Sequence, residues 1–436
     1  MKKNVYKNDS LSRKLRDLAP EEINGLPVIE NGRVKVSRRA EMPGAYSDDT
    51  FNSGQTKDLF KDVGQTDDKF DRTDANMSDT DETLSRYIET FSQQIIVIGV
   101  GGAGNNAISR LQETGLTGAL TLAVNTDAQD LFYTNSDQKL LIGKKITNGL
   151  GAGNNPSVGE QSAESDVDRI QEIVDRDVVF ITCGMGGGTG TGAAPVIARE
   201  AQKKGALVVS FCTLPFKMEG PAKRDAAYRG LSKLARYSDT VIPLPNEKLI
   251  KLIPKITLMK GFKIMDEILI RSVKGIVDLI SNCGLINLDL ADVKSVLSKK
   301  PDCSGFIGMT EIGPKMITST GSKNLSKSEI NKMLRDRTLK ALHNPLLEMK
   351  PAEIRSCLVS IKGNQKLSLE QVNQIVGTVS DSIHPRAKLK FGAMINPTLK
   401  KIKIHIIGLG EKCPHILYAE QMEADRSRRH NVEFLI

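Results

Sequence analysis

The sequence contains no tryptophan, and aromatic residues make up only 4% of its 436 positions, so its hydrophobic cores must be mainly aliphatic. Its six cysteines are scattered without a C-x-x-C pair, which argues against a disulfide framework or a zinc site and favours buried thiols in a reducing compartment. No apolar run reaches the roughly 18 residues of a membrane span, and the N-terminus lacks a signal-peptide core. These absences predict a cytoplasmic protein, and we assign no metal-ligating residues.

The chain has fewer acidic than basic residues, but this excess of positive charge is not evenly distributed along the sequence. The net charge is +9, with +5 in residues 1–40 and −8 in residues 41–91. A basic protein can bind nucleic acid, yet the sequence has no basic motif interleaved with aromatic residues and no zinc-finger or helix-turn-helix signature. We therefore interpret the basic remainder as a solvated surface and expect no nucleic-acid partner.

Glycine is concentrated in two clusters, residues 99–106 and 184–192, which lie about eighty residues apart. Each cluster follows a predicted buried strand and opens a predicted helix, an arrangement that turns backbone N–H groups and a helix N-terminus towards an anion. Glycine suits such loops because a side chain would collide with an approaching phosphate and because the turns use positive φ. The two clusters together predict a phosphate-binding site.

Short aliphatic strands alternate with helical segments between residue 92 and about residue 245. The expected strands are residues 95–100, 120–125, 140–142, 178–183, 207–213 and 240–243. Such alternation predicts an α/β fold with a parallel sheet covered on both faces. Ligands on these sheets bind at the carboxyl ends of the strands, where both glycine clusters fall.

One long helix is predicted over residues 257–282, with Gly284 as a C-cap. Its apolar residues recur at helical spacing, at Leu258, Phe262, Met265, Leu269, Val273, Ile276 and Ile280. A second, smaller α/β segment follows from about residue 286, with closing strands expected near 389–391, 403–407 and 431–435.

Residues 1–91 are polar and lack sustained apolar periodicity, which predicts a disordered N-terminal extension. Within it, Leu11, Leu15 and Leu18 share one helical face, and residues 13, 14 and 16 are basic. Residues 10–18 are either a transient helix of no consequence or a weak docking segment for a membrane surface or a partner. The acidic stretch that follows would act as an extended spacer.

The second glycine cluster carries a more specific signal. Residues 186–192 match the signature of the tubulin/FtsZ family of cell-division GTPases. Five further motifs occur along the chain in the order typical of the family. These are Asn125-Thr126-Asp127-Ala128-Gln129, residues 149–156, Pro215-Phe216 with Glu219-Gly220, Pro245-Asn246, and residues 287–292. The chain resembles this family over residues 92–436. Short segments such as residues 213–216 resemble the corresponding segments of its archaeal members.

The resemblance implies a GTP-binding domain at residues 92–256, a central helix at 257–284 and a C-terminal domain at 285–436. It implies that GTP or GDP is held by Gly101, Gly102, Gly104, Asn106, Gly151, Ala152, Gly187, Gly188, Thr189, Gly190, Thr191, Glu219, Lys223, Asn246, Phe262 and Asp266. In this reading Glu219 contacts the ribose, Phe262 stacks on the base, and Asn246 and Asp266 recognise guanine. The sequence has no P-loop lysine, so amide dipoles and Mg²⁺ would neutralise the triphosphate.

One position departs from the family pattern. The family's arginine, four residues after the ribose glutamate, falls at Lys223, with Arg224 next to it. A lysine offers a point charge instead of a planar fork, so either residue could fill this position.

The resemblance also implies that each nucleotide site is completed by a second subunit. Asn287, Asp289 and Asp292 resemble the loop that members of this family insert into the next subunit's site, where the aspartates orient the attacking water. A donor loop at one end and an acceptor site at the other propagate as an open head-to-tail filament. We expect a division-ring protein at mid-cell, with a membrane-anchoring adaptor as a further partner.

Two other functions compete with this interpretation. An NAD-dependent enzyme could use the first glycine cluster, but it would leave the second without a role, and all five histidines (His343, His384, His405, His415 and His430) lie outside the sheet domain. The other alternative is a family member that binds GTP without hydrolysing it. The complete set of residues 287, 289 and 292 argues against it.

Overall fold

The computed structural model describes residues 28–30, 33–35, 94–252, 257–281, 285–286, 288–298, 303–313, 327–343 and 349–433. Near the N-terminus, β1 (Val28–Glu30) pairs antiparallel with β2 (Arg33–Lys35). This pairing differs from the predicted lack of regular structure before residue 92; the intervening Asn31-Gly32 is a dipeptide typical of two-residue hairpins. Residues 10–18 lie outside the described part, so the docking segment stays a prediction.

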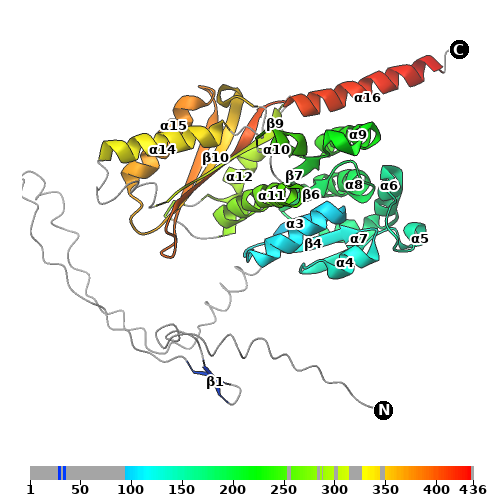
Figure 1. The fold of residues 1–436 in the computed structure, drawn as a ribbon, viewed down its shortest axis with the longest axis horizontal. Helices are drawn as coiled ribbons and strands as arrows, with labels where there is room; N and C mark the ends of the chain where they lie inside the picture. The colour runs from blue at the N-terminus through cyan, green and yellow to red at the C-terminus, as the bar shows by residue number, and fades with distance from the viewer. Residues whose placement is uncertain are drawn as a thin grey trace, which may run out of the picture. The chain divides into compact units, whose positions relative to one another are not determined.

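A six-stranded parallel sheet forms the first half of the main body, as predicted (Figure 1). Its order is β5-β4-β3-β6-β7-β8, and every neighbouring pair is parallel. The strands are β3 (Ile95–Val100), β4 (Leu120–Asn125), β5 (Gln138–Leu141), β6 (Val178–Gly184), β7 (Leu207–Leu214) and β8 (Thr240–Pro245). All six residues of β3 are buried, because helices cover both faces of the sheet.

The two faces of this sheet have separate aliphatic cores. On one face Ile96, Ile98 and Val100 pack with residues of α6 (Pro156–Ser165), α7 (Val167–Ile173), α8 (Thr189–Lys203) and α9 (Pro221–Tyr237). On the other, Ile95 and Val97 pack with α3 (Gly101–Glu113), α11 (Leu258–Ser281) and α12 (Leu290–Leu297). The shorter helices are α4 (Ala128–Tyr133), α5 (Lys144–Thr147), η2 (Lys217–Glu219) and α10 (Asn246–Leu252).

The predicted long helix is α11, and it begins and ends within one residue of the predicted bounds. Its apolar stripe, which includes Met265, Leu269 and Val273, is buried against the sheet. The predicted C-cap, Gly284, lies outside the described residues. The domain limits at residues 256 and 284 stay predictions.

A second, smaller sheet follows, with the order β11-β10-β12-β9. Its strands are β9 (Cys303–Ile312), β10 (Ile354–Gly363), β11 (Lys388–Ile395) and β12 (Ile402–Glu411), and only β10 and β11 are parallel. Helices α14 (Lys327–Leu342) and α15 (Leu369–Ser382), with the short η3 (Pro351–Glu353), accompany this sheet and share its core. The α/β class and the smaller C-terminal domain are therefore confirmed.

The last element is a helix, α16 (Pro414–Glu433), which begins against α9 (Figure 1). The strand expected over residues 431–435 was wrong for residues 431–433, which continue this helix; the residues beyond lie outside the described part. Among the residues that the structure describes, no helix is long and apolar enough to cross a membrane.

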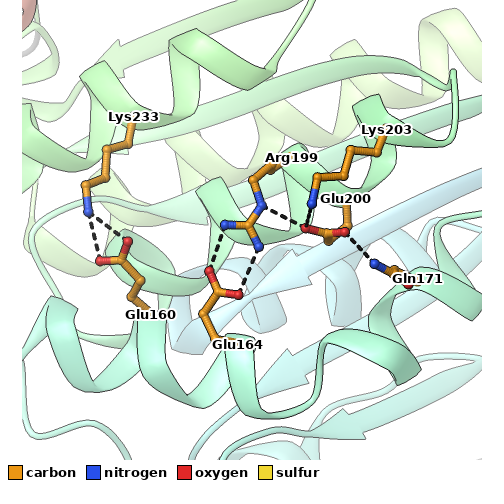
Figure 2. A network of polar contacts seen from close by, with 7 residues as sticks. All are labelled: Glu160, Glu164, Gln171, Arg199, Glu200, Lys203 and Lys233. Atoms are coloured by element: carbon orange, nitrogen blue, oxygen red, sulfur yellow. Dashed lines mark hydrogen bonds and ion pairs between the residues drawn. The ribbon is translucent and has the colours of Figure 1, made fainter.

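A polar network ties helices α6, α7, α8 and α9 together (Figure 2). Glu200 of α8 is completely buried and accepts hydrogen bonds from Arg199, Lys203 and Gln171 at 2.7–2.9 Å. Burial alone would raise the pKa of Glu200, but these donors outweigh it and lower the pKa to about 2. Arg199 also forms a bidentate ion pair with Glu164 of α6.

Candidate functional site

The two glycine clusters lie side by side because β3 and β6 are hydrogen-bonded neighbours. A Cβ added at Gly101 would lie 2.9 Å from the Gly190 nitrogen, so the two loops touch at their glycines. Gly101 also has a φ of +71°, a left-handed conformation that favours glycine. Both loops therefore need the absence of a side chain at their point of contact.

A cavity of about 540 Å³ opens at this edge of the sheet. Eleven of the predicted nucleotide-binding residues line it, namely Gly101, Gly102, Gly151, Ala152, Gly187, Gly188, Thr189, Gly190, Glu219, Asn246 and Phe262. A third loop, residues 149–155, also reaches the cavity, because Gly151 donates its N–H to the Thr126 carbonyl at 3.2 Å. Segments far apart in the sequence, between residues 100 and 262, thus converge here.

The N-terminus of α8 is directed to this cavity. This helix is fifteen residues long, and Gly188, Thr189 and Gly190 at its start are lining residues. The unpaired N–H groups of a helix N-terminus and its positive dipole end favour an anion. Thr189 is held by a 2.7 Å hydrogen bond between its hydroxyl and that of Thr126.

Other predicted residues of the glycine clusters do not line the cavity. Thr191 is buried, and its hydroxyl accepts a hydrogen bond from the Gly186 N–H at 2.8 Å, which holds the loop in shape. Gly104 packs α3 onto the sheet, since an added Cβ would lie 2.4 Å from the Thr182 carbonyl oxygen. Asn106 is exposed on α3, outside the lining residues.

The far end of the cavity suits a nucleobase. Phe262 is 42% exposed, and its ring meets that of Phe216 edge to face with centroids 5.7 Å apart. Asn246 is buried, and its Oδ1 has no hydrogen-bond partner among the residues that the structure describes. A buried acceptor without a partner is costly, so a ligand donor would satisfy it.

Asp266, the predicted guanine reader, does not line the cavity in this structure. Its Oδ2 is 2.5 Å from Nη1 of Arg110, which links α11 to α3. Burial raises the pKa of Asp266, and the Arg110 guanidinium opposes that rise. Asp266 lies one helical turn beyond Phe262, and base recognition would require its carboxylate to share or exchange its partner.

The structure separates the two candidates for the family arginine. Lys223 Nζ lies 3.1 Å from Oε2 of the cavity residue Glu219. Arg224 lines a different, smaller cavity together with Lys217 and Tyr228. Position 223 is therefore the one beside the predicted ribose contact.

The charge of the cavity is unusual for a phosphate site. None of its described lining residues is Lys or Arg, whereas Asp127, Asp130 and Glu219 are all among them. Asp127 is part of the motif of residues 125–129, for which no nucleotide contact was predicted. Asp127 caps α4 by accepting hydrogen bonds from the N–H groups of Gln129 and Asp130, and Asp130 accepts one from Asn125 at 2.6 Å.

Helix α11 leads from this cavity to the opposite edge of the sheet. Phe262 near its start lines the cavity, and a helix of 24 residues is about 36 Å long. At its other end, the Ser281 hydroxyl donates to the carbonyl of Gly118, two residues before β4. The amino ends of the strands are therefore beside the end of α11.

The predicted catalytic aspartates lie at that amino edge. Asp289 is the N-cap of α12, where its Oδ1 accepts a hydrogen bond from the Asp292 N–H at 2.6 Å. Further along α12, Lys294 forms a 2.8 Å ion pair with Asp177, the residue just before β6. Asn287 lies outside the described residues. The aspartates and the cavity of one chain are thus on opposite edges of one sheet.

The Asp292 carboxylate has a partner from the C-terminal domain. Its Oδ1 is 2.7 Å from Nζ of Lys390 on β11. The hydrogen bond and charge of Lys390 hold the pKa of Asp292 below its ordinary value, against a slight desolvation. The Asp292 side chain therefore carries a negative charge at neutral pH and is 27% exposed.

Comparison with known proteins agrees with these features. Residues 94–254 match the tubulin/FtsZ family, GTPase domain, and residues 315–411 match the FtsZ family, C-terminal domain. The chain is 42% identical over 364 residues to cell division protein FtsZ 1 of Pyrococcus horikoshii, covering 83% of this chain and 93% of that protein. It is 44% identical over 341 residues to cell division protein FtsZ of Methanothermobacter thermautotrophicus, covering 78% and 85% of the two chains.

Solved structures give the same result. An FtsZ dimer from M. jannaschii superposes with a TM-score of 0.66 at 42% identity, covering 76% of this chain and 92% of that one. CetZ1 from Haloferax volcanii has a TM-score of 0.64 at 20% identity, covering 76% and 100%, and shares the fold. With the parallel sheet, the glycine-lined cavity and these relatives together, the chain belongs to the tubulin/FtsZ family and carries its GTPase domain.

Proposed function

We propose that this protein is a cell-division GTPase that assembles head to tail, each nucleotide site being completed by the aspartate loop of the next subunit. The relatives above are named as cell division proteins, and one solved relative is described as a dimer. GTP and GDP are the expected ligands of the cavity. The single observation that carries the proposal is the position of Asp289 and Asp292 at the edge opposite to the cavity of their own chain.

This separation favours a second copy as the source of the aspartates. The two half-sites are on opposite edges of one rigid sheet, so they can meet only when the cavity edge of one subunit faces the aspartate edge of another. Such an interface is heterologous and continues as a filament. No covalent nucleophile is needed, because phosphoryl transfer depends on positioning of the water and on charge stabilisation.

The two aspartates have different roles in this proposal. Asp289 caps α12 and fixes the backbone of Asp292, so replacing it would also disturb the helix start. The Asp292 carboxylate pairs with Lys390 and also interacts with the Asp289 backbone, but Asp292 is not the N-cap of α12, and in this proposal it orients the attacking water in the neighbouring site. Asp292 is therefore the cleaner position for a test.

The donor set of the cavity also fits Mg²⁺. Mg²⁺ is usually held in proteins by one or two carboxylates, together with waters and the phosphates of the substrate. Asp127 and Asp130 line the cavity and supply oxygen ligands of this kind, without a lysine or arginine among the described lining residues. When bound, the ion would offset the charge of the triphosphate.

The proposal is tested by measuring phosphate release at increasing protein concentration. Turnover per subunit is expected to rise with concentration, because an isolated subunit has no complete site. Asp292→Ala should bind GTP normally and lose about 10²–10³-fold in turnover, the scale of one preorganised transition-state group. Its filaments should persist in electron micrographs, since the GDP state is rarely reached.

Asp336→Ala is the control, because it removes an exposed carboxylate of α14 in the C-terminal domain. Its turnover and GTP affinity should match those of the unmodified protein. Turnover per subunit that is independent of concentration would contradict completion of the site by a neighbour. Full activity of Asp292→Ala would remove this aspartate from the mechanism. An unmodified protein that binds GTP but releases no phosphate at any concentration would instead favour the non-hydrolysing alternative.

We further propose that the filaments act in the cytoplasm at the mid-cell division site. A membrane-anchoring adaptor and weak membrane contact through residues 10–18 would connect the filament to its site of action. Leu11, Leu15 and Leu18 with the neighbouring basic residues support the second of these.

A further inference from the structure

Lys390 contacts the aspartate loop from a distant part of the sequence. It lies on β11, the edge strand of the smaller sheet, and its Nζ is 2.7 Å from Oδ1 of Asp292. Both side chains are partly exposed, at 39% and 27%. Two contacts therefore hold Asp292: its backbone N–H donates to the Asp289 carboxylate, and its own carboxylate pairs with the Lys390 ammonium group.

The strand β11 is firmly attached to this loop. The N–H groups of Leu285 and Ile286 donate to the carbonyl of Ala393, and the Ala393 N–H donates back to Ile286, at 2.9–3.2 Å. A Cβ on Gly392 would lie 3.2 Å from the Ile286 carbonyl oxygen, so glycine permits this close approach. These backbone hydrogen bonds hold β11 beside the chain segment that leads into the aspartate loop, where Lys390 meets Asp292.

The positive charge of Lys390 would affect how the aspartate loop approaches the cavity of a neighbouring subunit. The acceptor cavity has carboxylates at Asp127, Asp130 and Glu219 and neither Lys nor Arg among its described lining residues. A loop that brought Asp289 and Asp292 alone to a bound triphosphate would add negative charge to negative charge. Juxtaposed like charges oppose association, whereas a cation at the donor edge would offset them.

We infer that Lys390 is a positioning residue of the shared site: its ammonium group fixes the Asp292 carboxylate towards the neighbouring nucleotide and offsets the negative charge of the loop. This inference rests on the proposed function, because it needs Asp292 to act on the next subunit. Lys390 acts through Asp292, and its own contact with the nucleotide is not required.

The test uses the full chain and replaces the ammonium group while keeping the aliphatic stem. Lys390→Met should lower turnover at saturating protein concentration about tenfold or more, the effect of losing a hydrogen bond between charged groups. Lys390→Arg should recover most of this loss. Thermal unfolding should hardly change, because partly exposed ion pairs contribute little to stability.

Lys388→Met is the matched control. It removes the same charge from the same strand, but Lys388 is not hydrogen-bonded to Asp292 and acts on it only at longer range. Its effect on turnover should be clearly smaller than that of Lys390→Met. Equal losses of turnover in the two variants would show that the total positive charge of β11 matters, and not the positioning of Asp292 by Lys390. That result would overturn the inference.

A double-mutant cycle separates action through Asp292 from independent action. If Lys390 works through Asp292, then adding Lys390→Met to Asp292→Ala should cause little further loss in single-turnover hydrolysis. A further tenfold loss would refute the positioning role. Full activity of Lys390→Met beside an inactive Asp292→Ala would refute this inference alone, whereas an active Asp292→Ala would refute the proposed function beneath it.

Discussion

Glycines within one cluster are required for different physical reasons. Gly101 lines the cavity with positive φ, whereas Gly99 and Gly104 allow α3 to lie directly on the sheet. A Cβ at Gly99 would lie 2.5 Å from the Gly104 carbonyl oxygen, a distance that real Cβ atoms do not reach. The sequence motif does not show which of these reasons applies to a given glycine. The packing around each glycine in the structure does.

Gly104→Ala should therefore destabilise the fold. The new methyl group would press on the Thr182 carbonyl at 2.4 Å, and overpacking of this kind costs about 1–3 kcal/mol. Gly102→Ala is the comparison, since its Cβ would meet only Asp130 Oδ2 at 3.6 Å. Thermal unfolding of both variants checks this, and equal melting temperatures would contradict the packing role of Gly104.

Asp266→Ala should weaken GTP binding and narrow the preference for GTP over ATP. A carboxylate can accept both N1–H and N2–H of guanine, and leaving such groups unpaired costs about 1–3 kcal/mol each. The affinities of both nucleotides are measured by titration at a concentration below assembly. If GTP affinity and the GTP/ATP ratio are unchanged, Asp266 serves only as the partner of Arg110.

At the scale of elements, the network around Glu200 makes the helix layer sensitive to acid. The folded pKa of Glu200, about 2, is below its ordinary value of 4.5, so its stabilisation is present above pH 4.5 and is lost as the pH falls towards 2. Glu200→Gln should cost roughly 3 kcal/mol at pH 7. About half of this difference in unfolding free energy between the unmodified protein and Glu200→Gln should be lost at pH 3, as measured by chemical denaturation.

Glu164→Gln is the control for that experiment. Glu164 is 43% exposed and pairs with the same arginine, and exposed ion pairs contribute about 1 kcal/mol or less. A loss in Glu200→Gln that does not depend on pH would contradict the assigned pKa.

Elements with continuous apolar runs were predictable, and half-exposed ones were not. β3, β6 and β7 are buried on both faces, so their sequences are mainly apolar. β9 and β10 were missed because polar residues and glycines interrupt their apolar runs, and β9 also lies at an edge of its mixed sheet. Residues 431–433, expected as part of a strand, continue α16, so local β-propensity was a poor guide there.

The site was predictable where one motif supplies adjacent backbone groups and less so where distant segments meet. The loops around Gly101 and Gly188 were found because glycine itself is the signal. The contact between Lys390 and Asp292 joins residues about one hundred positions apart, and nothing in either local sequence indicates it. Asp127 was visible in a motif, but its position in the cavity depends on the third loop.

At the scale of the whole molecule, the N-terminal extension is expected to act as a tether. Deleting residues 1–40 should leave hydrolysis and assembly intact but abolish sedimentation of filaments with anionic liposomes or with an adaptor protein. Many weak contacts on one filament gain about 10²–10⁴-fold in avidity, which would compensate for so short an apolar face. If full-length filaments ignore both liposomes and adaptors, the extension has no tethering role.

If subunits assemble as proposed, placing the two half-sites on opposite edges of one sheet would give every filament two chemically unlike ends. One terminal subunit would have an open cavity that no neighbour completes, and the other would have unused aspartates. A filament of n subunits would then contain n − 1 complete sites, and the GTP bound at the open end would be hydrolysed last. Short oligomers would lose the largest fraction of their activity to this end, so the turnover per subunit would depend on filament length.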